Sequence, residues 1–148
     1  MPQIERDYID TGKMKYVFMD FPLPMHGQAM KASEAALCAG DQDKFWEMHD
    51  RLFANQNALA LEALLKYAEA LGLDLTQFKE CLDSGKHAAD IKKRMSEGQS
   101  KAALTGTPGF LLGVIQADGT VKATKKVVGA VPFDKFKEAI DALLAKGK

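Results

Sequence analysis

The chain has 148 residues and a mass of 16.2 kDa, which fits one ordinary domain and excludes two. Apolar residues make up 47% of the sequence, so a sizeable core is expected and intrinsic disorder is excluded. Its 20 basic and 20 acidic residues cancel to a net charge of +0, which argues against a nucleic-acid partner bound through bulk positive charge. With two cysteines, Cys38 and Cys81, the chain is neither a disulfide-rich miniature nor a zinc ribbon.

The N-terminal residues predict a short helix followed by a strand. Apolar residues four apart predict a helix over residues 2–10 that ends at Gly12, and its shortness suggests the tail of a longer helix. Residues 13–21 are rich in β-branched and aromatic side chains with apolar residues on both faces, which predicts a mostly buried strand ended by Pro22. The uncharged stretches are broken by glycine or proline, so no membrane insertion is expected.

A block of helices follows, in which apolar residues recur three and four positions apart. Five helices are expected, over residues 28–38, 41–53, 61–71, 74–84 and 91–106. In the second of them, Phe45, Trp46 and Phe53 are interpreted as core packing, with part of a peptide-binding groove as the alternative. His49 lies on the same stripe and is interpreted as a buried or interface histidine.

The apolar period then changes from 3.6 to 2, which predicts a β-hairpin. Strands are expected over residues 110–115 and 121–128, joined by a turn at Ala117–Thr120, and a last helix is expected to begin at Pro132. This order of elements is typical of an α/β domain with a helical insertion. We expect the insertion at about residues 26–105, between core elements at 1–25 and 106–148.

Seven stretches in this order and spacing resemble the DsbA-like branch of the thioredoxin-fold proteins. They are YVFMDFPLP at 16–24, AALCAG at 35–40, KFWEMHDRLFANQ at 44–56, LGLD at 71–74, CLDSGK at 81–86, GTPGF at 106–110, and VVGAVPFDKF at 127–136 followed by IDALL. The resemblance implies one thioredoxin-like α/β domain over residues 1–148 with an inserted helical subdomain. It also implies thiol-disulfide oxidoreductase activity, the oxidation or isomerisation of cysteines in extended or unfolded protein substrates.

The family's chemistry needs a CxxC motif at the start of the first helix, where the helix dipole lowers a cysteine pKa. Residues 1–12 match the later part of that helix, so we expect the first central strand and the CxxC to lie before Met1. Neither Cys38 nor Cys81 matches a catalytic position, so the chain is expected to hold no catalytic residue and to be redox-inactive by the family mechanism. The alternatives are a non-catalytic peptide-binding module and a glutathione-using relative; no cofactor of the chain's own is expected.

The resemblance implies a substrate-binding loop at Thr107 and Pro108. In the family this proline follows a cis peptide bond, and the backbone of the residue before it pairs with an extended substrate peptide. The alternative is an ordinary trans proline between a helix and a strand.

The two cysteines lie on separate expected helices and allow three interpretations. They can be two buried thiols that act as small hydrophobic residues, a structural disulfide, or a redox-active pair; a disulfide needs Cα atoms within about 7 Å. His26, His49 and His87 show no metal-ligand spacing with each other or with the cysteines, so no metal site is expected. The lysines near the end of the hairpin, Lys122, Lys125 and Lys126, are interpreted as a solvated strand edge.

Two further expectations follow from the absence of the first strand and from the family. Unpaired strand edges recruit other strands, so we expect a homodimer or another association. The family suggests an extracytoplasmic, periplasmic location, although no leader is visible in the sequence.

Overall fold

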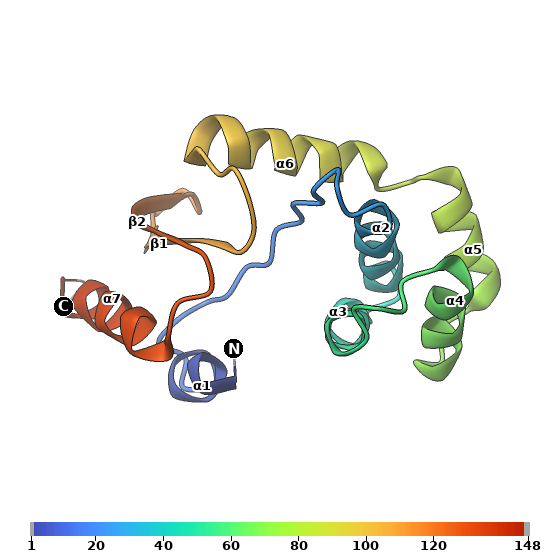
Figure 1. Cartoon of the computed structure of the whole chain (residues 1–148). Coiled ribbons are helices and arrows are strands. Elements are labelled where there is room, and N and C mark those ends of the chain that lie inside the picture. The colour runs from blue at the N-terminus through green and yellow to red at the C-terminus, as the bar shows by residue number, and fades with distance from the viewer. Residues whose placement is uncertain (1, 147–148) are drawn as a thin grey trace. The chain divides into compact units, whose positions relative to one another are not determined.

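The computed structural model describes residues 2–146 and divides the chain into two compact units (Figure 1). One unit contains residues 1–19 and 102–148, and the other contains residues 20–101. The boundaries expected for the helical insertion, at about residues 26 and 105, stay a prediction. The elements, in chain order, are α1 (Pro2–Ile4), the π-helix η1 (Glu5–Ile9), α2 (Ala29–Gly40), α3 (Phe45–Ala54), α4 (Leu61–Ala70), α5 (Leu75–Ser84), α6 (Ala88–Ala102), β1 (Gly109–Ile115), β2 (Val121–Val128) and α7 (Phe133–Lys146).

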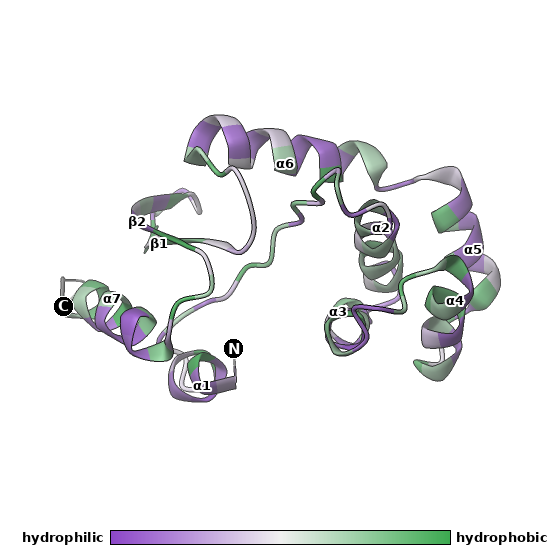
Figure 2. Cartoon of the chain, in the orientation of Figure 1, coloured by the Kyte–Doolittle hydropathy of each residue, from purple (hydrophilic) through white to green (hydrophobic). Residues whose placement is uncertain are grey.

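The unit of residues 20–101 consists of helices around an alanine-rich helix, α2. The alanines on one face of α2 are almost fully buried, and such small side chains let neighbouring helices pack closely. Larger side chains from the surrounding helices fill the rest of this core; Met48, Leu64, Phe78 and Leu82 are at most 1% exposed. Figure 2 shows purple, hydrophilic residues along much of α6, in which Ile91 is the residue that packs inward.

Local signals in the sequence fix both ends of α5. Asp74 precedes the helix, and its carboxylate accepts hydrogen bonds from the backbone N–H groups of Thr76 (2.9 Å) and Gln77 (3.0 Å). Gly85 ends the helix in the left-handed conformation, with φ of 62°. The side chain of Gln42, just after α2, bonds both the N–H (2.8 Å) and the C=O (3.2 Å) of Asp74, which holds the start of α5 against the end of α2.

A buried acid lies in the same unit. Asp20 is 4% exposed, and its Oδ2 is 3.4 Å from a guanidinium nitrogen of Arg94. Burial raises the pKa of Asp20 above its usual value, and the hydrogen bonds from Ser33 and Arg94 only partly offset this effect.

The other unit is built on the antiparallel hairpin of β1 and β2. Its register runs from Gly109 opposite Val128 to Ile115 opposite Val121, with an irregularity between Leu112 and Gly113. A Cβ atom on Gly113 would overlap the backbone carbonyl oxygen of Lys122, so the position accepts only glycine without a backbone shift. The predicted strands, turn and final helix are confirmed.

Two N-terminal side chains and α7 form the core of this unit. Ile4 and Tyr8 are buried together with Phe136 and Ile140, and the ring of Phe136 meets that of Phe110 edge-on at 4.8 Å. The Tyr8 hydroxyl donates to Oδ1 of Asp141 at 2.8 Å. The predicted N-terminal helix is therefore present, although most of it is π-helical.

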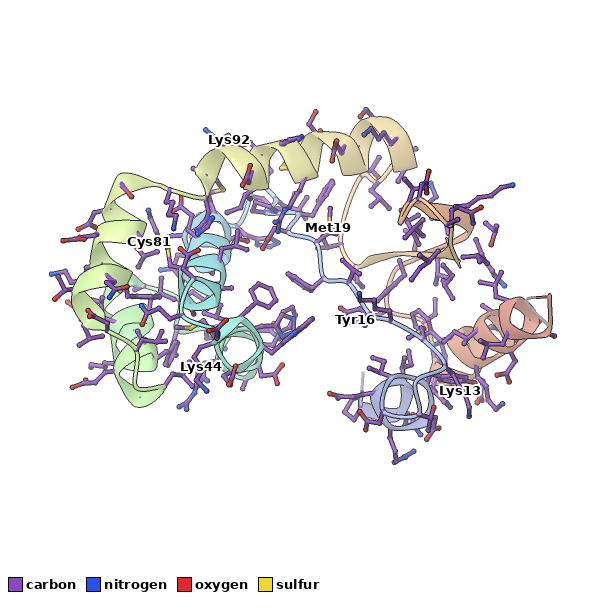
Figure 3. The ribbon with its side chains drawn as sticks, turned by 180° about the vertical axis from the view of Figure 1, so that it is seen from behind. Lys13, Tyr16, Met19, Lys44, Cys81 and Lys92 are labelled. Atoms are coloured by element: carbon purple, nitrogen blue, oxygen red, sulfur yellow. A yellow bond between two sulfur atoms is a disulfide. The ribbon has the colours of Figure 1, made fainter. Side chains whose placement is uncertain are left out.

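The predicted strand over residues 13–21 is not formed. Residues 14–23 belong to no helix or strand, and the sheet described within residues 2–146 contains β1 and β2 alone. Figure 3 shows Tyr16 and Met19 on this drawn-out segment, where Met19 is 52% and Val17 is 62% exposed. Its apolar pattern suits a strand, but a strand also needs a neighbour to share its backbone hydrogen bonds.

The core interpretation of α3 is also wrong for two aromatic residues. Trp46 is 46% and Phe53 is 55% exposed, whereas Met48 and Leu52 are buried. Met48 and Leu52, with the partly buried Phe45, form the stripe that faces the core, and residues 46, 49 and 53 form the adjacent face. There the rings of His49 and Phe53 are 4.6 Å apart, and the His49 side chain is only 14% exposed. No helix in the described residues is long and apolar enough to cross a membrane.

Candidate functional site

The loop before β1 presents an exposed stretch of backbone. The Thr107–Pro108 peptide bond is cis, and both residues are exposed. Pairing with β2 begins one residue later, at Gly109, and the carbonyl of Pro108 accepts a hydrogen bond of 2.8 Å from the N–H of Gly129. Within residues 2–146, no hydrogen bond occupies the backbone N–H or C=O of Thr107.

Packing from the preceding chain supports this loop. The methyl carbon Cδ2 of Leu104 lies against Gly109, and a Cβ atom added to Gly109 would be only 2.7 Å from it. Gly109 therefore gives the Leu104 side chain room beside the first residue of β1. At the N-terminal end of the loop, the ammonium group of Lys126 donates to the carbonyls of Ala102 (3.1 Å) and Ala103 (3.3 Å). The loop is thus held at both ends while Thr107 remains exposed.

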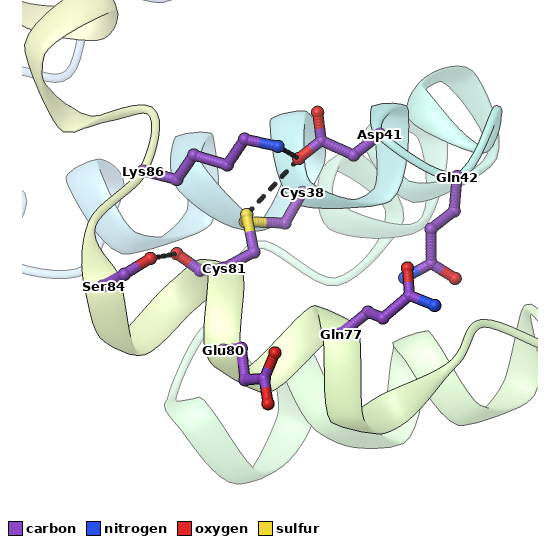
Figure 4. A pocket seen from close by; sticks show the side chains of 8 residues that line it. All are labelled: Cys38, Asp41, Gln42, Gln77, Glu80, Cys81, Ser84 and Lys86. Atoms are coloured by element: carbon purple, nitrogen blue, oxygen red, sulfur yellow. Dashed lines mark hydrogen bonds and ion pairs between the residues drawn. A yellow bond between two sulfur atoms is a disulfide. The ribbon is translucent and has the colours of Figure 1, made fainter.

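A second candidate site surrounds the two cysteines in the helical unit. Cys38 in the last turn of α2 and Cys81 in α5 form a disulfide, with Cα atoms 5.9 Å apart. Cys38 is 1% exposed and Cys81 is partly exposed. A pocket of about 340 Å³ opens beside the disulfide and is lined by polar side chains. They are Asp41, Gln42, Gln77, Glu80, Ser84 and Lys86 (Figure 4).

The carboxylate of Asp41 bonds two basic side chains beside this pocket. Its Oδ2 accepts hydrogen bonds from Lys86 Nζ and from His87 Nε2, both at 2.9 Å, and lies 3.6 Å from Sγ of Cys81. Partial burial alone would raise the pKa of Asp41, but the bonds from Lys86 and His87 outweigh it and hold the pKa below its usual value. Asp41 is therefore an anion at neutral pH.

The structure brings together residues that the sequence did not relate. A ring nitrogen of His87 and the sulfur atoms of Cys38 and Cys81 all lie within 4.8 Å of one another. His26 is exposed on the loop before α2, and His49 lies on α3. The spacing gave no signal for the position of His87, because it depends on how the α5–α6 connection turns back toward the end of α2.

A family model described as thioredoxin matches residues 1–142. The chain belongs to the thioredoxin family. Among solved structures, alpha-DsbA1 of Wolbachia pipientis has a TM-score of 0.82 at 28% identity, over 98% of this chain and 75% of that chain. A Rickettsia prowazekii relative named as a protein-disulfide oxidoreductase is 27% identical over 148 residues, 95% of this chain and 53% of its own length. The Na⁺/H⁺ antiporter NhaA 1 of Salinispora arenicola is 40% identical over 112 residues, 75% of this chain and 17% of the antiporter.

These matches confirm the thioredoxin-like fold with its helical insertion and the similarity to DsbA-like proteins. The chain spans 17% of the antiporter and about half of the Rickettsia relative. Within this thioredoxin-family chain, Thr107 and Pro108 lie in the loop that the resemblance marked, and Cys38 and Cys81 lie in the helical unit.

Proposed function

We propose that this chain provides the peptide-binding part of a DsbA-like thiol-disulfide oxidoreductase. Thr107 and Pro108 bind an extended or unfolded protein substrate, and the backbone of Thr107 pairs with the substrate backbone as an added strand would. The proposal rests on the exposed backbone of Thr107, the residue before the cis proline. The N–H and C=O groups of Thr107 make no hydrogen bond within residues 2–146.

The chain by itself is proposed not to exchange disulfides at this loop. Thiol-disulfide exchange needs a thiolate beside the bound peptide, and the sequence contains no CxxC motif. Both of its cysteines are bonded to each other in the unit of residues 20–101. Insulin reduction and dithiol oxidation by this chain should therefore stay at the level of the blank. Turnover that survives replacement of both cysteines would contradict this.

We propose an extracytoplasmic location and a homodimer as the setting for this activity. The Cys38–Cys81 disulfide supports the location, because disulfides persist mainly in oxidising compartments. The apolar residues exposed on the hairpin, among them Leu111 and Val128, support self-association. Light scattering coupled to size exclusion tests the dimer, and a monodisperse monomer at high concentration would refute it.

Peptide binding is tested with a fluorescently labelled, unfolded peptide and anisotropy titrations. Thr107→Pro removes the proposed N–H donor and should weaken binding at least tenfold, whereas Thr107→Ala keeps the backbone and should bind as the unmodified chain does. Circular dichroism of both variants checks the fold. Equal affinities of well-folded Thr107→Pro and Thr107→Ala would contradict the proposed backbone pairing.

A further inference from the structure

The cluster around the disulfide has the composition of a metal site. Two sulfur atoms and one imidazole nitrogen, from Cys38, Cys81 and His87, lie within 4.8 Å of one another. They come from three places in the helical unit: the last turn of α2, the start of the last turn of α5, and the residue before α6. Cysteine thiolates and histidine nitrogens are the ligands that zinc prefers in proteins.

We propose that Cys38, Cys81 and His87 bind a zinc ion when the disulfide is reduced. An external dithiol supplies the two electrons and two protons that convert the S–S bond into two thiols, and is itself oxidised to a disulfide. Zinc then displaces the two thiol protons, which pass to solvent, and binds both thiolates and the neutral imidazole. Disulfide and metal therefore exclude each other at this position.

The geometry allows this exchange without moving the helices apart. With zinc–sulfur bonds of about 2.3 Å and tetrahedral angles, the two sulfur atoms have to separate to about 3.8 Å. The Cα atoms of Cys38 and Cys81 are 5.9 Å apart, so rotation of the two side chains can provide this separation while the backbones stay in place. Cys81 is partly exposed, so its side chain has room to turn. The pocket beside the disulfide provides an entry path and space for a water molecule as the fourth ligand.

Asp41 and Lys86 complete the site. A metal-binding histidine usually bonds a carboxylate through its other ring nitrogen. His87 already bonds Asp41 through Nε2 at 2.9 Å, so zinc would bind at Nδ1. Two thiolates balance the charge of Zn²⁺, and Lys86, 2.9 Å from Asp41, balances the carboxylate. The assembled site is therefore neutral, which favours it in a partly buried position. Asp41 acts as a positioning residue that orients the ring.

Cobalt(II) serves as a spectroscopic probe for this site. The chain is reduced with a dithiol, desalted without oxygen and titrated with Co²⁺, and the oxidised chain is titrated in parallel. The reduced chain should bind one equivalent, with thiolate-to-cobalt charge-transfer bands and the intense visible bands of a tetrahedral site, and one equivalent of Zn²⁺ should abolish them. The oxidised chain should show neither band. Zinc should also raise the melting temperature of the reduced chain only.

Variants that keep both cysteines separate this site from unspecific thiol binding. His87→Ala should weaken cobalt binding at least tenfold, and Asp41→Asn should weaken it about 10- to 100-fold while the same bands remain. His26→Ala, a histidine on an exposed loop, should bind as the unmodified chain does. Unchanged affinity of His87→Ala, or equal binding to the oxidised and reduced chains, would overturn the proposal. The melting temperature of each oxidised variant verifies that it folds.

Discussion

The Cys38–Cys81 disulfide should be a major source of stability in the helical unit. Replacing both cysteines with alanine removes the link and adds no polar group to the alanine-rich core around α2, in which Cys38 is 1% exposed. Alanine is small enough to fit both positions. The expected cost is therefore mostly the restored freedom of the unfolded chain.

The magnitude follows from the length of chain that the disulfide closes. The two cysteines are separated by 43 residues in sequence. In the chain-entropy description, a loop of this length lowers the entropy of the unfolded state by about 13 cal/mol/K, or about 4 kcal/mol at 25 °C. Small domains unfold with only about 5–15 kcal/mol, so the double variant should lose a large share of its stability.

Urea unfolding followed by circular dichroism measures this loss. The double variant and the dithiol-reduced chain, with metal ions excluded, should be destabilised to a similar extent, by roughly 3–5 kcal/mol relative to the oxidised chain. Ser84→Ala is a matched control in the same pocket, since it removes only a hydrogen bond of 3.1 Å to the carbonyl of Cys81. It should change the unfolding free energy by about 1 kcal/mol or less. A loss below about 1 kcal/mol in the double variant would refute the reasoning from loop closure.

Three further variants test local features. Asp74→Ala removes the cap of α5 and should cost about 1 kcal/mol in urea unfolding, whereas the exposed Asp83→Ala on the same helix should cost less than half of that. Gly113→Ala should cost about 2 kcal/mol, because its Cβ would meet the Lys122 carbonyl; a neutral effect would contradict the described register. Burial raises the pKa of Asp20 above 3.8, so the folded state binds the proton more tightly, and stability falls as the pH rises from 3.8 through the raised pKa. Asp20→Asn does not titrate, so it should gain stability relative to the unmodified chain over that interval; a pH-independent difference between the two would contradict this.

The elements that sequence predicted best carry their own start and stop signals. The turn from Ala117 to Thr120 contains Gly119 with φ of 81°, and the side chain of Asp118 accepts from the N–H of Thr120 at 2.9 Å. These interactions join residues that are close together in the sequence, so short sequence patterns predict the turn. Asp74 and Gly85 mark α5 in the same way.

The features that sequence did not predict depend on distant neighbours. Residues 13–21 have the composition of a strand, but strand formation needs a second strand beside them. Trp46 and Phe53 lie one position away from the buried stripe of α3, a difference of about 100° around a helix that an apolar count does not resolve. His87 joins Cys38 and Cys81 only through the packing of α2 on α5. The candidate loop at Thr107 and Pro108 came from the family resemblance, because one proline in a loop is uninformative by itself.

The amide proton of Thr107 reports on the proposed binding of extended protein segments by the Thr107 backbone. In a ¹⁵N-labelled chain titrated with an unfolded, cysteine-free peptide, we predict a large shift of the Thr107 amide resonance at saturation. Its exchange with solvent should also slow, because the N–H gains a partner. The amide of Asp83 in α5 serves as the internal control and should keep both its shift and its exchange rate. A bound peptide that leaves the Thr107 amide unshifted and as fast to exchange as in the free chain would contradict binding through the Thr107 backbone.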